Sequence, residues 1–225
     1  GGSVVGEVIT PDGRLVVGAW VALGPPTASR SLLVDGSVRW SPVAEVVQTG
    51  RDGRFAATGV HADALKPVEV SVLADGYPIW MGSVSVEPGV ERLLSIQLDA
   101  GMDVSGTVRD HDGAPVANAE VSVVATAAAP HLRCAFPFPA TRTGMDGTYR
   151  LAWVTPGSVT LRIWPPSSTE LQIAVCKIVG SPGDSVDQDV TLTRNLSIAG
   201  RVVDRDGKPL VGMSVVASPE SGHGW

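Results

Sequence analysis

Two cysteines and six tryptophans are the residues of this 225-residue chain with the most specific chemistry. Cys134 and Cys176 form no Cys-x-x-Cys pair and have no histidine at ligand spacing, so a zinc site is not expected. In an oxidising compartment they would pair as one disulfide, which would stabilise the fold by roughly 4 kcal/mol. The alternative is two buried thiols that pack as small apolar side chains.

The tryptophans outnumber the two tyrosines and three phenylalanines together. Trp20 lies between Ala19 and Val21, which we expect to face inward, so Trp20 should face outward. The same reasoning turns Trp164 outward, and Trp40 lies on an insertion. Exposed aromatic rings can stack on sugars or anchor a protein partner, so these three are the candidate ligand-binding residues. The alternative is that they pack between successive repeats or under loops.

No catalytic or metal-binding pattern stands out. The four histidines (His61, His111, His131 and His223) are dispersed over predicted loops, and no Gly-x-Ser-x-Gly or His-Glu-x-x-His motif occurs. The turns at Asp110-x-Asp112-Gly113 and Asp204-x-Asp206-Gly207 are rich in carboxylates but lack the later glutamate of a calcium loop. We therefore predict structural turns, no metal, no cofactor and no enzymatic activity.

Charge and composition limit the classes of partner that we expect for this chain. The net charge is −6, with 17 basic and 23 acidic residues, and nucleic-acid binding would favour a basic surface instead. With 44% hydrophobic residues, 26 glycines and 17 prolines, the chain should fold into strands and turns. No apolar run is long enough to cross a bilayer, which takes about 20 residues.

Internal repeats organise the chain. Three segments open with the same apolar pattern around a central glycine, at Gly6, Gly106 and Gly200, and each runs into an Asp-Gly turn. Gly106 holds an inward strand position where we expect close backbone approach. Further along, residues 49–55 mirror residues 143–149. The repeats predict three domains: residues 1–100, residues 101–195, and residues 196–225 as the first hairpin of a truncated third domain.

Each repeat reads as strands. Val68, Val70 and Val72 alternate with polar residues, which is the pattern of a half-buried strand. Seven Asp-Gly dipeptides supply tight hairpin turns. Repeats of about 95 residues with such turns predict an all-β fold of tandem seven-stranded antiparallel Greek-key β-sandwiches, two complete and a third partial.

Three local features are expected besides. Residues 31–34 and 37–40 flank Asp35-Gly36 and should form an added hairpin in the first repeat. Residues 127–139 of the second repeat are rich in proline, so we expect an ordered loop there, pinned by Cys134. Residues 196–225 are too few to bury a core, so either the native protein continues beyond Trp225 or another chain completes the hairpin, which would give self-association.

The second repeat carries a motif of turn and core residues. Its positions are Gly106, Val108, Asp110, Gly113, Pro115, Ala119, Val121, Thr143, Asp146, Gly147, Tyr149, Pro156, Gly157 and Leu161. This motif resembles the carboxypeptidase regulatory-like domain. The first repeat departs from it at Leu15, Phe55 and Lys66-Pro67, and the third matches only its first half.

The resemblance implies a transthyretin-like (prealbumin-like) sandwich that occurs as tandem modules in secreted and surface proteins and is not itself catalytic. We expect a non-enzymatic, extracytoplasmic segment that acts as a spacer, adhesion or protein-interaction module of a larger secreted or cell-surface protein. Its partners would be proteins or polysaccharides at a cell surface. The alternatives are a carbohydrate-binding module that uses the exposed tryptophans, and an accessory domain of a secreted peptidase.

Overall fold

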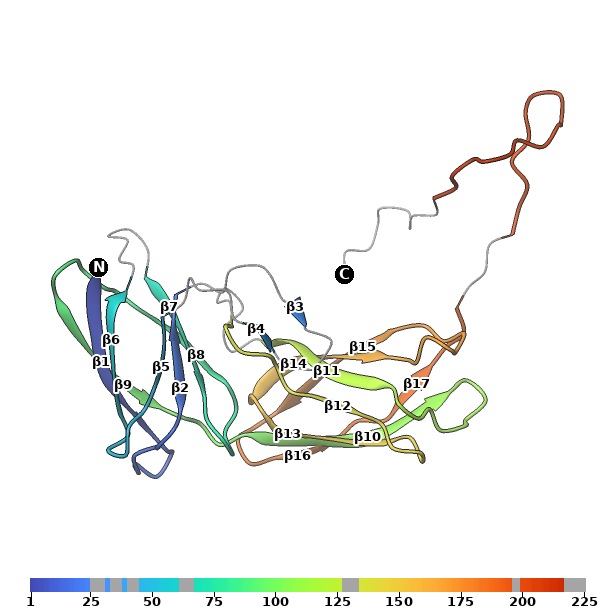
Figure 1. Cartoon of the computed structure of the whole chain (residues 1–225). Coiled ribbons are helices and arrows are strands. Elements are labelled where there is room, and N and C mark those ends of the chain that lie inside the picture. Colours follow the sequence, from blue (N-terminus) through green and yellow to red (C-terminus); the bar gives the residue numbers. More distant parts are fainter. Residues whose placement is uncertain are drawn as a thin grey trace. The chain divides into compact units, whose positions relative to one another are not determined.

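The computed structural model describes residues 1–24, 31–32, 38–39, 45–60, 67–126, 134–195 and 199–216. None of these residues belongs to a helix, and none lies in a helix that could cross a membrane. The chain divides into two compact units, Gly1–Arg194 and Asn195–Trp225. The strands of Figure 1 confirm the predicted all-β architecture.

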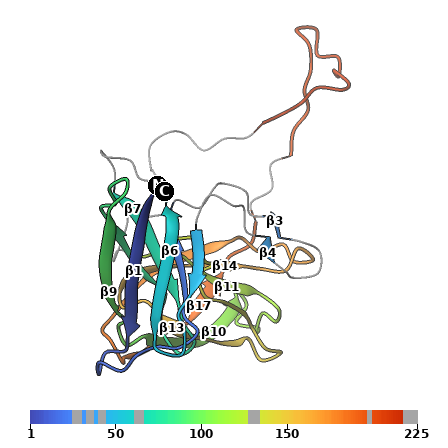
Figure 2. The same ribbon diagram turned by 60° about the vertical axis from the view of Figure 1, so that its left-hand side comes forward.

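Residues 2–97, which we call sandwich 1, form two larger sheets and, in the insertion, a two-stranded one. A three-stranded sheet has the order β6-β1-β9, and Figure 2 shows these three strands side by side. A four-stranded sheet has the order β5-β2-β7-β8. The strand bounds are β1 Gly2–Ile9, β2 Trp20–Leu23, β5 Glu45–Gln48, β6 Arg54–Val60, β7 Val68–Leu73, β8 Trp80–Val84 and β9 Glu91–Gln97.

Residues 102–192, which we call sandwich 2, repeat this arrangement. One sheet has the order β13-β10-β16, with β17 also paired to β10, and the other has the order β12-β11-β14-β15. The strand bounds are β10 Met102–Asp110, β11 Glu120–Thr126, β12 Ala140–Arg142, β13 Thr148–Val154, β14 Gly157–Trp164, β15 Ala174–Gly180, β16 Ser185–Asp187 and β17 Val190–Leu192.

Each sandwich contains parallel strand pairing. β1 pairs in parallel with β9, from Ser3 opposite Glu91 to Ile9 opposite Gln97. β10 pairs in parallel with β16 and then with β17. The first and last strands of each repeat therefore lie next to each other, an arrangement that the expectation of purely antiparallel sheets did not include.

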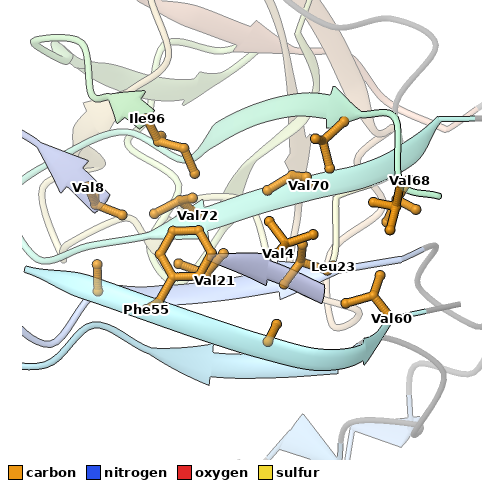
Figure 3. Close-up of a cluster of buried hydrophobic side chains, with 14 of the residues drawn as sticks. Val4, Val8, Val21, Leu23, Phe55, Val60, Val68, Val70, Val72 and Ile96 are labelled. Carbon is orange, nitrogen blue, oxygen red and sulfur yellow. The ribbon is translucent and has the colours of Figure 1, made fainter. Parts of the chain in front are cut away.

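Alternating apolar side chains build a separate core in each sandwich. Figure 3 shows the core of sandwich 1, where Val4 and Phe55 of one sheet lie opposite Val21 and Val72 of the other. A second cluster extends from Met102 to Leu192 in sandwich 2. The predicted boundary near residue 100 thus separates two cores within one compact unit, and as a domain boundary it stays a prediction.

The Asp-Gly turns are confirmed wherever they are described. Their glycines adopt positive φ at positions 13, 53, 76, 113, 147 and 207, and Gly36 lies outside the described residues. Asp110 shows how such a turn is closed, because its Oδ1 accepts hydrogen bonds from the backbone N–H groups of Asp112 and Ala114, each at 2.9 Å. Asp204 does the same for Asp206 and Lys208.

A buried threonine binds the segment that leads into the second strand at the same place in each sandwich. Thr143 Oγ1 donates to the carbonyl of Val116 at 2.6 Å and accepts from the N–H of Ala119 at 2.9 Å. Thr49 makes the matching pair of bonds with Val16 and Ala19. Buried backbone groups need such partners, so these threonines explain part of the repeated sequence pattern.

The central glycine of the first strand is required by close backbone approach. A Cβ at Gly106 would lie 2.1 Å from the carbonyl oxygen of Gln188, and one at Gly6 would lie 2.1 Å from that of Leu94. A Cβ at the matching Gly200 would meet nothing within 4 Å. The expected close approach at Gly106 is confirmed, and it depends on a complete sandwich.

Two further expectations concern the insertion and the third repeat. Strands β3 (Ser31–Leu32) and β4 (Val38–Arg39) pair antiparallel, as predicted for the added hairpin, whose turn lies outside the described residues. Residues 199–216 contain the bridge between Val203 and Pro209 and no named strand. Their valines are largely exposed, as expected for a segment without a core of its own.

Candidate functional site

Trp20 and Trp164 both face outward, as the strand pattern predicted. Trp20 begins β2 and is 44% exposed, and Trp164 ends β14 and is 51% exposed. They belong to different sheets, Trp20 in sandwich 1 and Trp164 in sandwich 2, so the structure does not join them in one sheet face. Trp40 lies outside the described residues. Ligand binding by these tryptophans stays a prediction.

A loop of sandwich 2 packs on the outer face of the four-stranded sheet of sandwich 1. We call residues 134–139 the aromatic loop. Phe136 is buried in a cluster with Ala22 and Ile79, against which Leu73 and Met81 also pack. Ala22 and Leu73 do not belong to the core cluster of sandwich 1, because alternate residues of a strand point to opposite faces.

Hydrogen bonds support this contact. The backbone N–H of Ala135 donates to Ser71 Oγ at 3.2 Å, and Thr155 Oγ1 donates to the carbonyl of Ile79 at 3.5 Å. At the other end of the loop, the carbonyl of Pro139 accepts from the N–H of Val123 at 3.0 Å. The expectation of an ordered loop holds for its described part, and the sequence did not indicate that sandwich 1 would be its partner.

The expected Cys134–Cys176 disulfide is not formed. The two side chains pack on different clusters: Cys134 on the one around Phe136, and Cys176 in β15 against the core of sandwich 2. Burial raises the pKa of the Cys176 thiol, so that side chain is the protonated, weakly polar form that packs as a small apolar group. Sequence spacing cannot show that two cysteines face different surroundings.

Trp153 was not singled out by the sequence, yet its backbone is unusual. It has φ 58°, a left-handed conformation that costs a bulky residue roughly 1–2 kcal/mol, and its side chain is 50% exposed. The β10–β13 register shifts at this point. The matching residue of sandwich 1 is Gly59, with φ 77°. Comparing the two repeats could have revealed this replacement of a glycine by a tryptophan.

A shallow hollow of about 450 Å³ lies over the gap between β16 and β17. Thr107 donates from its N–H and its hydroxyl to Asp189 Oδ1, at 2.7 and 2.5 Å, and this lowers the pKa of Asp189. Tyr149 donates to the carbonyl of Gln188 at 2.7 Å, and burial raises the pKa of its phenol. These groups are engaged in holding the strands together and form no pair of nucleophile and base.

The carboxylates of the acidic turn are also engaged. Asp110, His111 and Asp112 have ligand atoms within 4.8 Å of one another. However, Asp110 closes the turn, and Asp112 is paired with His111 at 3.1 Å and Arg194 at 3.6 Å. The turn predicted for this segment is present, and the absence of a metal there stays a prediction. The other three histidines lie outside the described residues.

Known structures with a similar course of the chain include two pilins and the TIE protein of Bacillus anthracis. GBS52, the minor pilin of Streptococcus agalactiae, is 10% identical with a TM-score of 0.43, and the match covers 91% of this chain and 100% of that one. A streptococcal ancillary pilin is 13% identical with a TM-score of 0.39, covering 86% and 62%. The TIE protein of Bacillus anthracis is 12% identical with a TM-score of 0.36, covering 93% and 40%.

The chain thus spans 40% of the TIE protein and 62% of the ancillary pilin. No curated protein sequence matches it. The family model of the carboxypeptidase regulatory-like domain matches residues 103–193, which are almost the bounds of sandwich 2. This match agrees with the motif of turn and core residues in the second repeat. The similarity to the carboxypeptidase regulatory-like domain therefore extends over residues 103–193.

Proposed function

We propose that this chain is a non-enzymatic, extracytoplasmic array of β-sandwich modules that sets a fixed spacing within a larger secreted or surface protein. The modules are residues 1–100 and 101–195, and residues 196–225 follow the first-hairpin pattern of a third. The family implies the location, since its modules occur in tandem in secreted and surface proteins. It also leaves open a role beside a secreted peptidase.

The observation that carries the proposal is the contact between the two repeats. Leu98, the last core residue of sandwich 1, and Met102, the first of sandwich 2, are separated by only three residues. Within that connection, a Cβ at Gly101 would lie 2.8 Å from Trp153 Cα. Phe136 buries its ring against the preceding sandwich. A short connection with an apolar contact across it limits the relative motion that flexible linkers permit.

The test is the substitution Phe136→Ala in the full chain. Loss of a buried phenylalanine costs about 3–5 kcal/mol, and here the loss falls on the contact between sandwiches and not on either core. We expect ¹⁵N relaxation to give one correlation time for both sandwiches in the unchanged protein and two shorter ones in the variant.

Met145→Ala is the matched control, because Met145 lies in an exposed turn of sandwich 2 and should leave the relaxation unchanged. If Phe136→Ala tumbles like Met145→Ala, the two sandwiches are not held by this contact and the spacer proposal fails.

Carbohydrate binding is a second candidate, favoured by the exposure of Trp20 and Trp164. A planar sugar face stacks on such rings. A glycan array with intrinsic fluorescence as a second readout tests it: a response that is lost in Trp20→Ala or Trp164→Ala supports binding. No response to any polysaccharide contradicts it.

A further inference from the structure

The strand registers define which residues of the two four-stranded sheets correspond. Val21 pairs with Val72 in sandwich 1, and Val121 pairs with Ile163 in sandwich 2. The outward neighbours of these pairs therefore occupy matching places. The matches are Ala22 with Ser122, Ser71 with Arg162, Leu73 with Trp164, and Met81 with Val175.

In sandwich 1 this outer face is covered. Ala22 and Ser71 are almost fully buried, at 1% and 3% exposure, although their side chains point away from the core. The aromatic loop provides the cover through Phe136 and Ala135. The sheet and the loop together form a docking arrangement between successive repeats.

In sandwich 2 the matching face is more exposed. Besides Trp164, the edge strand β15 exposes Val175 and Val179, at 57% and 73%, which is unusual for large apolar side chains on neighbouring strands. Among the described residues, Arg162 and Lys177 of the same face form no ion pair. We call Ser122, Arg162, Trp164, Val175, Lys177 and Val179 the open face.

We propose that the open face is the docking surface for another β-sandwich module, which presents a proline-flanked aromatic loop as residues 134–139 do. The proposal extends the proposed spacer function to the next contact along an array. The covered face of sandwich 1 shows the interaction, and the open face repeats its position on the sheet. The exposed apolar residues provide the area that such a loop would remove from water.

The side chains of the open face indicate which chemical groups the docking loop should carry. Arg162 replaces Ser71, which accepts the N–H of Ala135 in sandwich 1. Arginine only donates, so the docking loop should offer a carbonyl or carboxylate oxygen there. Trp164 replaces Leu73 and gives the aromatic side chains of the loop a larger surface. A loop that is tethered by a short connection needs little intrinsic affinity, because its effective concentration is high.

The test uses the full ¹⁵N-labelled chain and a peptide with the sequence of residues 133–140, Arg-Cys-Ala-Phe-Pro-Phe-Pro-Ala, with its cysteine replaced by serine. In the chain the copy of this loop already covers the matching face of sandwich 1, so that face is not free to bind the added peptide. We expect saturable shifts of the Trp164 indole and the Val175 and Lys177 amides at millimolar peptide. A peptide in which both phenylalanines are alanine should give none.

Two variants of the chain locate the binding. Val175→Asp should abolish the shifts, whereas Leu93→Asp, at a similarly exposed residue on β9 of sandwich 1, should preserve them. No saturable shift at millimolar peptide, or shifts that survive Val175→Asp, would overturn the proposal.

Titration with soluble oligosaccharides tests the alternative that the open face binds a glycan. Saturable shifts of Trp164 with an oligosaccharide and none with the peptide would assign the face to a glycan and overturn module docking. The outcome is independent of the spacer test, because Phe136→Ala reports on the covered face of sandwich 1 alone.

Discussion

The two sandwiches have nearly interchangeable interiors and different surfaces. Both place a glycine at the centre of the first strand and bind the segment before the second strand with a buried threonine. Outside the core they differ. The outer sheet face around Ala22 in sandwich 1 is covered, whereas the matching face around Trp164 in sandwich 2 is exposed. Core positions are constrained by packing, whereas faces are free to specialise in contacts. Substitutions at matching positions of the two sandwiches test this difference.

The largest effect should follow from the central glycines. Gly106→Val would push side-chain atoms into the backbone at Gln188 and should cost sandwich 2 at least about 3 kcal/mol. Gly6→Val should do the same in sandwich 1 against Leu94. Thermal unfolding of the full chain measures both.

Gly200→Val is the matched control, because a Cβ there meets nothing within 4 Å. We expect no change in melting. Equal damage from all three substitutions would mean that the third repeat forms the same closed sandwich as the others, and an unchanged melt for Gly106→Val would show that its strand is misplaced.

Substitutions at Trp153 of β13, whose backbone is left-handed, should change stability less. The sign of the difference between the glycine and alanine variants reports on that backbone conformation. In an ordinary strand alanine is more stabilising than glycine, by about 0.5–1 kcal/mol. At Trp153, with φ 58°, the order should reverse, so Trp153→Gly should be about 1 kcal/mol more stable than Trp153→Ala.

Gly59→Ala should lose a comparable amount in sandwich 1, where φ is 77°. Urea unfolding compares the three variants. If Trp153→Ala is the more stable of the two exchanges, the backbone there is not left-handed and the match with Gly59 is lost.

The smallest effect should be a pH dependence specific to sandwich 2. Hydrogen bonds from Thr107 lower the pKa of Asp189, so the folded state favours the ionised carboxylate. The stabilisation is present above the unfolded pKa of about 4 and is lost as pH falls through the lower folded value.

Asp189→Asn should therefore flatten the acid side of a plot of melting temperature against pH. Asp187→Asn, which removes a carboxylate from the same hollow and leaves the bonds between Thr107 and Asp189 in place, is the control. Sandwich 1 places the carboxylate on the opposite strand: Glu7 of β1 accepts from Ser95 of β9 at 3.4 Å. If melting temperature depends on acidic pH in the same way in both variants, the Asp189 carboxylate does not cause the pH dependence.

Local patterns predicted the parts of the fold that depend on neighbouring residues. Alternation placed Trp20 and Trp164 outward, and Asp-Gly dipeptides marked turns whose glycines adopt positive φ. The repeated glycine indicated close approach at Gly106. These features follow from strand geometry and turn chemistry, which are written in short stretches of sequence.

The remaining features depend on distant residues. The parallel pairing of β1 with β9 joins segments almost a whole repeat apart, and nothing local encodes it. The docking of Phe136 on sandwich 1 required knowing which face of a sheet lies nearest the loop. The two cysteines suggested a disulfide only because spacing carries no information on the surroundings of each side chain.

The parallel pairing has a mechanical consequence. The chain enters sandwich 1 at the start of β1 and leaves it from the far end of β9, which lies alongside and runs in the same direction. Tension applied through the two ends would pull these neighbours along their length in opposite senses. The hydrogen bonds between the two strands would then be loaded in shear. They would carry the load together and would not break one after another.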